Sequence, residues 1–551
     1  MRYHTIQTML RIVFVVLTLL SMCHCARILV LFPFPSMSHK IIATPLLREL
    51  ATRGHQVTVF SPYPEKQPHP NITDVVMIEA VYMNHIRPKS MFEIRGGYKY
   101  IDTHWEMGVS ITDFMLEDPK IQALIQAKDK EFDLVIIEAF FNEAFLGFAH
   151  KFQAPIIQLS TIDGGSWVGD WVGNTAPYSY VPNNYLPYTE RMNFWQRFIN
   201  TLFGTYILVG RHFCYLPQQD AIMKKHFGAS VPSLQELEGR TSLLLLNQHF
   251  SLSGAKPLLP NVVPIAGINI PTPRNLTKEL QTFMDESPNG VVYFSMGTHL
   301  KSSDMIDSMK EAFLNSFSRL KQRVLWKLDI DTLPNLPENV KVSKFLPQVD
   351  LLNHPNMRVF ITHCGISSAN EAAYSGVPVI GIPVFGDQDI TAQRTSEQGL
   401  EWFLSTRREG LGAPGPWGLS GYSFEKLDLT VSGTDAGWST TQRRIHECHP
   451  GHLSYRENAQ RLSRVFRDQP LTPLERAVFW TEYVIRHKGA PHMRSAALDL
   501  AWYQYFLLDV IAFLVLAVGS VLLIVFLVLR AVSRKLCSGS KKDKMSHKKK
   551  D

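Results

Sequence analysis

The stretch Phe345-Leu-Pro-Gln-Val-Asp-Leu-Leu-Asn-His-Pro355, continued by Val359-Phe-Ile-Thr-His-Cys-Gly365, decides the fold of this chain. Its apolar, β-branched run 359–362 predicts a buried parallel strand. A turn at 363–365 leads into a predicted helix over 367–375, and the next strand is predicted over 379–382. A strand, a tight turn and a helix N-terminus form an anion site, because free backbone N–H groups and the helix dipole point at the ligand. We expect that anion to be a diphosphate.

The polar side chains of this stretch suit a nucleotide sugar. His363 follows the strand, where ligands bind in open α/β sheets, and can donate to a phosphate oxygen. Ser367 and Glu371 are four residues apart, so one helix face offers a hydroxyl for phosphate and a carboxylate for a ribose diol. Asp387 and Gln388 follow the next strand and can hold sugar hydroxyls. Taken singly, His363 is equally typical of a core histidine and Glu371 of an ordinary helix charge, and only their joint spacing favours a ligand site.

The segment 345–388 resembles the signature of the membrane-bound UDP-glycosyltransferases, which conjugate small lipophilic molecules with a sugar. Phe345 stands where that family has Trp; it can still stack on uracil, with less area and no N–H. Residues 294–298 (Phe-Ser-Met-Gly-Thr) resemble the family's phosphate-facing loop. The resemblance implies that Phe345 and Gln348 hold uracil, that Ser295, Gly297, Thr298, His363, Gly365, Ser367 and Ser368 hold the diphosphate, that Glu371 holds the ribose, and that Asp387 and Gln388 hold the donor sugar.

The segment Phe34-Pro-Ser-Met-Ser-His39 resembles the family's loop that bears the catalytic histidine. A base must deprotonate the acceptor hydroxyl as it attacks, and histidine has a suitable ordinary pKa. The position of the family's orienting Asp is occupied by Glu138, which is one methylene longer. Alone, His39 is more typical of an ordinary helix-start histidine. Beside the donor signature, we interpret His39 as the base and Glu138 as its partner.

Composition indicates a globular protein, and neither the charge nor the cysteine and histidine spacing indicates a nucleic-acid or metal site. The 551 residues are enough for two or three domains, and 45% hydrophobic with 19% charged residues excludes a disordered chain. The net charge of +7 points to no nucleic acid, because nine Lys and Arg against two Asp lie after Leu529 and account for it. The six cysteines predict no disulfide framework. His446, Cys448, His449 and His452 match no standard zinc spacing, so we expect no metal and no cofactor.

The two ends of the chain predict a membrane protein with a lumenal body. Residues 1–25 combine basic residues with a short apolar run, which predicts a secretory signal peptide; an uncleaved anchor is the alternative. Residues 506–529 predict a transmembrane helix, and the basic tail 530–551 then lies in the cytosol. The final lysines resemble a dilysine retrieval signal of the endoplasmic reticulum, although such a tail also binds anionic lipid. Asn71 and Asn275 begin glycosylation sequons.

Strands that alternate with helices predict two parallel, doubly wound sheets. In glycosyltransferases, two facing Rossmann-like domains of this kind form the GT-B fold. We expect an N-terminal acceptor-binding domain over 26–267, a Pro-rich linker over 268–280 and a C-terminal UDP-sugar-binding domain over 281–505. The predicted strands are 26–32, 56–60, 133–138 and 154–160 in the first half, and 291–296, 323–327, 340–343, 359–362 and 379–382 in the second.

Two segments leave alternatives open. Residues 394–453 depart from the family pattern, lack helical periodicity and are too long for an ordinary loop, so they replace the helix that should brace Asp387 and Gln388. Eight aromatic residues of the N-terminal half suit an apolar acceptor pocket, and equally suit packing on one another or on a membrane surface. They are Trp167, Trp171, Tyr178, Tyr180, Tyr185, Tyr188, Phe194 and Trp195.

The resemblance implies an inverting hexosyltransferase of the endoplasmic reticulum membrane, with a single C-terminal span. It would move a hexose, glucose before glucuronate, from a UDP-sugar to a hydroxyl of a small lipophilic acceptor, as in detoxification. The alternative, because of residues 394–453, is a catalytically impaired partner or regulator of intact transferases. In either case we expect that the chain can form a homo- or hetero-oligomer. A transferase acting on a membrane sphingolipid would differ only in its acceptor.

Overall fold

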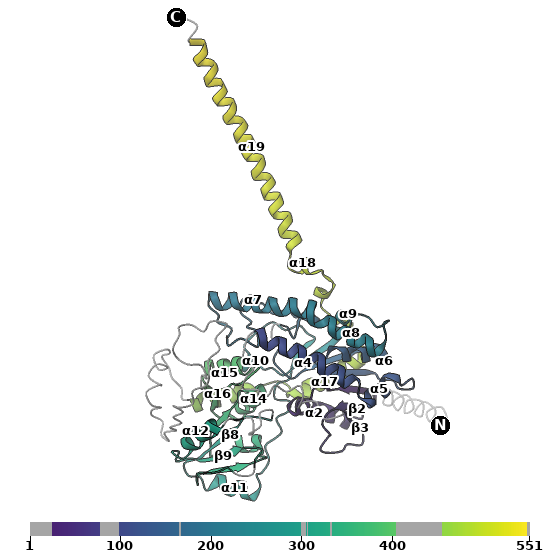
Figure 1. The fold of residues 1–551 in the computed structure, drawn as a ribbon, viewed down its shortest axis with the longest axis vertical. Coiled ribbons are helices and arrows are strands. Elements are labelled where there is room, and N and C mark those ends of the chain that lie inside the picture. Colours follow the sequence, from purple (N-terminus) through teal and green to yellow (C-terminus); the bar gives the residue numbers. More distant parts are fainter. Residues whose placement is uncertain are drawn as a thin grey trace, which may run out of the picture. The chain divides into compact units, whose positions relative to one another are not determined.

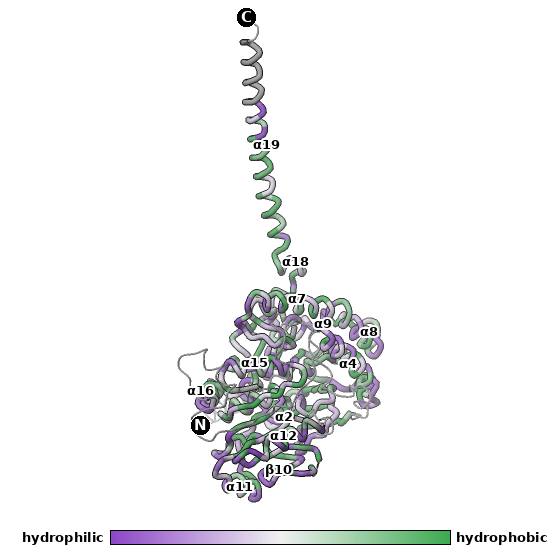
Figure 2. Tube along the Cα trace, turned by 60° about the vertical axis from the view of Figure 1, so that its left-hand side comes forward, coloured by the Kyte–Doolittle hydropathy of each residue, from purple (hydrophilic) through white to green (hydrophobic). Residues whose placement is uncertain are grey.

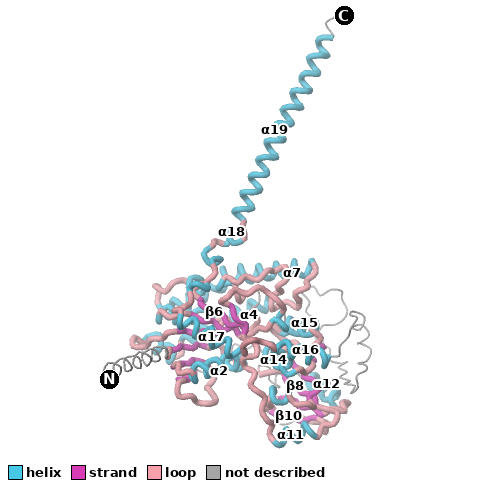
Figure 3. The backbone as a smooth tube through the Cα atoms, turned by 180° about the vertical axis from the view of Figure 1, so that it is seen from behind, coloured by secondary structure: helices cyan, strands magenta, loops and turns pink. Residues whose placement is uncertain are grey.

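The computed structural model describes residues 25–77, 98–164, 167–298, 305, 307–330, 333–403 and 455–547. The predicted signal peptide, apart from Cys25, and residues 404–453 of the predicted atypical segment lie outside the described residues. The chain forms two compact units, 1–494 and 495–551. The first unit contains two parallel sheets, drawn as strands in Figures 1 and 3.

The first sheet has the strand order β3-β2-β1-β4-β5-β6-β7, with every pairing parallel. The order reverses between β1 and β4, and open α/β sheets bind ligands at the carboxyl ends of strands at such a point. The central strands β4, β5 and β6 are buried along their whole length, as parallel strands covered by helices on both faces require, whereas the edge strand β3 is partly exposed. Their bounds are β1 Arg27–Leu31, β2 Gln56–Ser61, β3 Ile72–Val76, β4 Leu134–Glu138, β5 Ile156–Ser160, β6 Thr241–Leu246 and β7 Val262–Pro264.

Helices cover both faces of this sheet and form one core on each. One core packs α4 and its neighbours on the sheet, and the other packs α2 against the opposite face. The helices are α2 Met37–Thr52, α4 Tyr98–Leu116, α5 Pro119–Gln126, α6 Gly147–Phe152, α7 Phe194–Gly210, α8 Leu216–Phe227, α9 Leu234–Glu238 and α10 Phe250–Ser253. Short turns lie at Glu143–Leu146 and Asp170–Val172, and a π-helical turn at Arg211–Tyr215 joins α7 to α8.

The second sheet has the order β10-β9-β8-β11-β12-β13, again all parallel. Its order reverses between β8 and β11, the kind of position at which open α/β sheets bind ligands. The strands are β8 Val291–Ser295, β9 Arg323–Lys327, β10 Val340–Ser343, β11 Met357–Thr362, β12 Val379–Gly381 and β13 Glu401–Phe403. The helices are α11 Lys278–Asp285, α12 Asp307–Phe317, α13 Gln348–Leu352, α14 Ile366–Ser375, α15 Gln388–Glu397 and α16 Tyr455–Arg467.

The first residues of the segment predicted to be atypical form regular secondary structure. We expected the departure to begin at Arg394, but α15 continues to Glu397 and β13 follows at Glu401–Phe403, paired with β12. The helix that braces Asp387 and Gln388 is therefore present, and this part of the prediction is wrong. The sequence misled because the helix ends in the polar residues Thr395-Ser396-Glu397 without an apolar stripe.

The last helix of the first unit crosses between the halves. α17 (Pro473–Arg486) lies within the predicted domain 281–505, yet its buried Ala477, Val478 and Val484 belong to the core of the first sheet, beside α2. Thr472 caps it through a capping box with Glu475. The chain thus ties the second half back to the first.

The second unit contains a helix long enough to cross a bilayer. α19 runs over Leu508–His547, and its part Leu508–Lys535 has a mean hydropathy of 3.2 in the most apolar window. Figure 2 shows its apolar part as a continuous hydrophobic stretch. Short helical turns precede it at Pro491–Met493 and Ala496–Asp499, with α18 at Trp502–Tyr505.

Candidate active site

His39 and Glu138 meet at the carboxyl ends of adjacent strands. β1 and β4 pair in parallel, with Leu31 opposite Ile137, so the residues after the two strands emerge at the same edge. His39 lies in the first turn of α2, and its Nδ1 is 2.5 Å from Oε1 of the fully buried Glu138. Oε2 of Glu138 accepts a hydrogen bond from the Phe34 N–H at 3.1 Å. Because both carboxylate oxygens are held, the imidazole is oriented and Nε2 is the nitrogen left to take a proton.

Aromatic rings extend from His39 into the N-terminal half. Phe34 stacks on His39 at 5.2 Å between ring centroids, and Phe140 meets it edge-on at 4.7 Å. The contacts continue through Phe141 to His104 and Tyr100, and Tyr100 lies 5.2 Å from Tyr185. Phe34, Tyr100, Phe141 and Tyr185 are buried in one core of the first sheet, so this row of rings packs closely from the base into the N-terminal half.

The eight aromatic residues singled out in the sequence do not act as one group. Trp167, Trp171 and Tyr185 are buried in the same core, and Tyr185 also joins the row of rings that leads to His39. Phe194 and Trp195 are exposed on α7, at 61% and 67% of their full surface. Packing on one another is therefore confirmed for the buried residues, and the acceptor pocket and the membrane surface stay predictions.

The turn predicted to bind an anion in the second half has the expected strand–turn–helix geometry. β11 ends at Thr362, Cys364 adopts the left-handed φ of 63°, and Gly365 is the N-cap of α14. His363 lies between two glycines: a Cβ on Gly297 would lie 2.5 Å from the ring, and one on Gly365 would lie 2.6 Å from it. Only glycine fits at these two positions. Gly297 also has a φ of 79°, which L side chains rarely adopt.

Charges at this turn favour an anion. Burial, together with the nearby Lys327, lowers the pKa of His363 to about 4, so its ring is neutral and can donate one N–H. Lys327 ends β9 and its Nζ donates to the Gly297 carbonyl at 3.0 Å. Sequence reasoning missed Lys327, although a lysine that ends a buried strand at the ligand edge was a usable signal.

Glu371 and Gln348, the expected ribose and uracil residues, lie in direct contact. Gln348 Nε2 donates to Glu371 Oε2 at 2.6 Å, and its Oε1 accepts from the Tyr293 hydroxyl at 3.1 Å. Asn269, from the linker, donates to Glu371 Oε1 at 3.4 Å. Burial raises the pKa of Glu371 to about 7 despite these donors and Lys327. The two residues thus form one polar cluster that a ribose could enter.

Asp387 and Gln388 begin α15 and have different surroundings. Gln388 is 3% exposed, and its Oε1 accepts from the N–H groups of Val384 and Phe385 at 2.7 and 3.0 Å, so its oxygen holds the turn. Asp387 Oδ2 has no hydrogen-bond partner within the described parts of the chain. Burial raises the pKa of Asp387 to about 6, and His39 and Arg394 act in the opposite direction. His39 is therefore near enough to act electrostatically on Asp387 across the two halves.

The remaining predicted donor residues occupy the same edge of the second sheet. Ser295 ends β8 and its Oγ accepts from the Gly297 N–H at 3.2 Å. Ser367 and the buried Ser368 lie in the first turn of α14, and Thr298 is exposed. Phe345 is 72% exposed, as a stacking platform for a base requires.

A buried ionic network connects the two halves next to Asp387. Arg394 of α15 donates to Asp163 Oδ2 at 2.7 Å and to Glu190 Oε1 at 3.1 Å, and both acceptors belong to the first half. Lys256 donates to the other oxygen of Asp163 at 2.7 Å. Beside it, the Tyr100 hydroxyl lies 3.1 Å from where a Gly386 Cβ would stand. These contacts could not be predicted from the sequence, because the residues that make them lie far apart in the chain.

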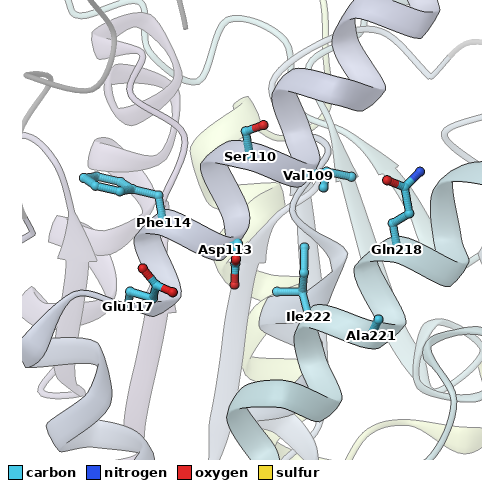
Figure 4. Close-up of a pocket in the computed structure, with 8 residues that line it drawn as sticks. All are labelled: Val109, Ser110, Asp113, Phe114, Glu117, Gln218, Ala221 and Ile222. Atoms are coloured by element: carbon cyan, nitrogen blue, oxygen red, sulfur yellow. The ribbon is translucent and has the colours of Figure 1, made fainter. Parts of the chain in front are cut away.

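A shallow pocket between α4 and α8 lies outside this arrangement (Figure 4). Asp113, Glu117 and His226 gather there at a spacing that a metal ion could use. Lys225 donates to Asp113 and Glu117 at 2.8 Å, and His226 lies 2.9 Å from Asp113. The carboxylates are therefore already paired with cations, and we assign no site to them.

Comparison with known families identifies close relatives. The model of the family described as UDP-glucoronosyl and UDP-glucosyl transferase matches residues 27–407 and 451–543. UDP-glycosyltransferase UGT5 of Dactylopius coccus is 38% identical, with 96% of both chains covered. UDP-glucuronosyltransferase 2B7 of Homo sapiens is 30% identical, with 93% of this chain and 94% of the human protein covered. The unmatched residues 408–450 place the departure from the family later than the predicted Arg394.

Comparison with solved structures supports the fold. The glycosyltransferase VinC in complex with DTDP has a TM-score of 0.52 at 18% identity, covering 84% of this chain and 98% of that one. The spinosyn forosaminyltransferase SpnP has a TM-score of 0.51 at 18% identity, covering 84% and 99%. The expected GT-B fold of two parallel-sheet α/β halves is confirmed.

Proposed function

Because this chain belongs to the UDP-glucuronosyl and UDP-glucosyl transferase family, we propose that it moves glucose from UDP-glucose to a hydroxyl of a small lipophilic acceptor. The observation that carries the proposal is the juxtaposition of three groups. His39 is oriented by Glu138 in the first half and acts on the pKa of Asp387 from the second half. The base and the carboxylate proposed to hold the sugar therefore lie near each other across the two halves.

The chemistry proposed is a single inverting displacement. His39 Nε2 takes the proton of the acceptor hydroxyl, and the acceptor oxygen attacks the anomeric carbon. The bond from that carbon to the diphosphate oxygen breaks, and UDP leaves with the electron pair. Glu138 stabilises the imidazolium that forms. An α-linked UDP-sugar then gives a β-glycoside.

The proposed donor site lies along the edge of the second sheet. Phe345 stacks on the uracil, and Glu371 with Gln348 binds the ribose. The N-terminus of α14, with His363 and Lys327, stabilises the charge on the leaving diphosphate. We propose no metal or cofactor for this role, because neutral and cationic donors of the chain itself are aimed at that position.

The charges around Asp387 favour glucose over glucuronate. Asp163, Glu190 and Asp387 are carboxylates. Among the described residues, Arg394 and Lys256 pair with the first two, and His39 and Arg394 act on Asp387 without a hydrogen bond to its Oδ2. The two carboxylate oxygens of Asp163 already accept hydrogen bonds from Arg394 and Lys256. The Arg394 guanidinium donates to Asp163 and to Glu190. A glucuronate carboxylate would therefore meet an uncompensated negative charge, whereas glucose hydroxyls can donate to Asp387.

The proposed acceptor lies on the aromatic side of His39. Phe34 and Phe140 flank the base, and Tyr100 connects that surface to the Gly386 turn of the other half. Apolar walls with a single base suit a phenol or another lipophilic alcohol, as conjugation in detoxification requires. We propose that this body is lumenal in the endoplasmic reticulum, on the anchor α19.

A catalytically impaired regulator of the same fold is the second candidate. It is favoured by one observation, the interruption of the family match over 408–450, which follows β13 directly. A regulator would need the fold and the membrane helix but not the proton transfer at His39.

The test compares UDP release from UDP-glucose with a phenolic acceptor by the full chain and by His39→Ala. His487→Ala, at an exposed histidine of the C-cap of α17, is the matched control. The transferase predicts activity in the full chain and the control that is lost in His39→Ala. If the full chain binds UDP but forms no UDP from UDP-glucose, the regulator is favoured. If the full chain does not bind UDP, the proposed donor site is overturned. Replacing UDP-glucose by UDP-glucuronate tests the sugar.

A further inference from the structure

The residues that follow β4 have a strained backbone close to the base. Phe141 lies three residues beyond Glu138 and has a φ of 53°, in the left-handed region that a bulky L residue rarely adopts. Its side chain is buried and stacks on Trp167 at 5.1 Å between ring centroids. Strain of this kind persists only where the surroundings enforce it, and it gathers at functional sites. The turn at Phe141 therefore needs contacts that hold it in place.

Helices α4 and α8 supply those contacts, and Figure 4 shows the two helices side by side. The Phe141 carbonyl accepts from the Thr112 hydroxyl of α4 at 3.2 Å and from Gln219 Nε2 of α8 at 3.4 Å. Both side chains are fully buried, and Gln219 Oε1 accepts from the Ala144 N–H at 3.1 Å. A Cβ on Gly108 would lie 2.6 Å from the Phe141 Cβ, so the backbone of α4 lies directly against this residue. We call the two donors, Thr112 and Gln219, the Phe141 clamp.

The Phe141 clamp is part of a buried polar network. Gln219 Nε2 also lies 3.0 Å from the Tyr215 hydroxyl, which donates to Glu143 Oε2 at 2.5 Å. Glu143 Oε1 accepts from Arg211 at 3.0 Å. A buried polar group that loses its partner is costly, so these bonds support one another. The clamp therefore cannot shift without breaking further bonds of the network.

The residue before Phe141 lies against the base. The Phe140 ring meets the His39 ring at 4.7 Å with an interplanar angle of 85°. Phe34 stacks on the same imidazole with an interplanar angle of 21°. Glu138 fixes the position of His39 Nδ1, but one hydrogen bond leaves the plane of the ring free to turn. The two phenyl rings, one nearly parallel and one nearly perpendicular to the imidazole, remove that freedom.

We propose that Phe140 is a positioning residue for His39, and that the Phe141 clamp holds Phe140 in place. The proposal rests on the proposed transferase function, because it concerns the base of that reaction. Phe140 acts through the direction in which His39 Nε2 points, and a misplacement of about 1 Å in such a group can cost about 100-fold in rate. Thr112 and Gln219, on α4 and α8, are thereby linked to the rate of proton transfer.

The first test measures kcat and KM for UDP release by the full chain with a phenolic acceptor. Phe140→Leu keeps an apolar side chain but removes the ring, so kcat is expected to fall about 10–100-fold at an unchanged KM for UDP-glucose. Thr112→Val removes one donor of the clamp and should lower kcat about fivefold. Thr112→Ser keeps the hydroxyl and should restore kcat to within about twofold of the wild type.

Thr481→Val is the matched control. Like Thr112, Thr481 is a fully buried helix residue of the first unit, and its hydroxyl donates to the Ala477 carbonyl at 2.8 Å. The control should lose stability in the same way and keep the kcat of the wild type. The double variant Phe140→Leu/Thr112→Val should have the kcat of Phe140→Leu alone, because the clamp acts through Phe140.

Three results of this test overturn the proposal. They are a raised KM for UDP-glucose at unchanged kcat, effects of the two substitutions that multiply in the double variant, and a fall in kcat of the control equal to that of Thr112→Val. Thermal unfolding shows that each variant is folded at the assay temperature. A wild-type chain that releases no UDP overturns the proposed function, and a measurement without turnover then decides the role of Phe140.

That second measurement is the acylation of His39 by diethyl pyrocarbonate, quantified by mass spectrometry of the modified peptide. The His39 side chain is 14% exposed in the folded chain. Phe140→Leu and Thr112→Val are expected to raise the rate of modification about threefold, because the ring can turn away from its packed position. Thr481→Val should leave the rate unchanged. Equal rates in the wild type and all variants overturn the role of Phe140, whether or not the chain is a transferase.

Discussion

At the residue scale, His39 and Glu138 show how a longer side chain meets the same requirement as an aspartate. Glu138 is withdrawn into β4 with no exposed surface, and its two oxygens bind His39 Nδ1 and the Phe34 N–H. The extra methylene is therefore taken up by the strand end, and the contact of 2.5 Å to the ring is kept. The altered geometry considered from the sequence does not separate the pair.

Replacing Glu138 by Gln should lower kcat and leave the KM for the UDP-sugar unchanged. The side-chain volume is kept, but the charge that stabilises the imidazolium is lost, so kcat should fall about 10²–10⁴-fold. Steady-state kinetics of UDP release measures both constants. Glu236→Gln, in an exposed surface pair with Arg240, is the control. A kcat close to that of the wild type would remove Glu138 from the mechanism.

The raised pKa of Glu371 predicts that the free energy of unfolding of the ligand-free protein depends on pH. Burial raises its pKa from 4.5 to about 7, so the folded state holds the proton more tightly than the unfolded state. The stability that the protonated Glu371 contributes is complete below its ordinary pKa of 4.5. It is lost as the pH rises through the folded-state pKa of about 7. Relative to wild type, Glu371→Gln should therefore gain stability from pH 4.5 to 7, by about 1.4 kcal/mol per unit of pKa difference.

Thermal unfolding of both proteins across this range gives the difference directly. Glu338→Gln, at an exposed position, should show no such trend. A difference between Glu371→Gln and wild type that does not change with pH would show that the carboxyl is not buried as described.

At the scale of elements, α15 decides whether the sugar-binding end of the site is supported. It follows Asp387, carries Arg394 into the acidic pair Asp163 and Glu190, and ends before β13. The sequence of α15 has no apolar stripe, because one side faces the ionic network rather than a core. This is why the pattern of residues failed to predict its end.

Replacing Arg394 by Met should destabilise the first unit. The change leaves Asp163 and Glu190 buried or half-buried with Lys256 as their remaining cation, and breaking a buried pair costs about 3–5 kcal/mol. Urea unfolding measures the loss, and Arg240→Met, in an exposed pair with Glu236, should cost about 0–1 kcal/mol. Equal effects of the two substitutions would show that the network does not join the halves.

At the scale of the whole molecule, the two sequons report on the orientation of the chain. Asn275 is exposed in the linker, whereas Asn71 is partly buried and its Nδ2 donates to the Ala51 carbonyl at 2.9 Å. A lumenal body on α19 would make Asn275 the accessible acceptor.

In cells with an endoplasmic reticulum, the full chain should carry an N-glycan that endoglycosidase treatment removes. Asn275→Gln should abolish the mobility shift because the linker site is lost, and Asn71→Gln should keep it. An unglycosylated chain that nevertheless resists alkaline extraction from membranes would contradict the lumenal orientation.

The sequence by itself determined the local elements of this protein and its family. Apolar β-branched runs predicted β1, β8, β11 and β12, and the turn at 363–365 predicted the anion site, because these depend on neighbours in the chain. The strands β3, β6, β7 and β13 were missed, since short runs such as Ile72–Val76 and Thr241–Leu246 carry no unambiguous period.

Only the tertiary structure decided which distant groups meet. The contacts of Arg394 with Asp163, of Gln348 with Glu371 and of α17 with the first sheet join residues far apart in the chain. The burial of Phe203 and Ile207 and the exposure of Phe194 and Trp195 on α7 likewise depend on what packs against this helix, because both kinds occur within one hydrophobic segment. Periodicity reports which residues share a face, but burial depends on the partner that covers it.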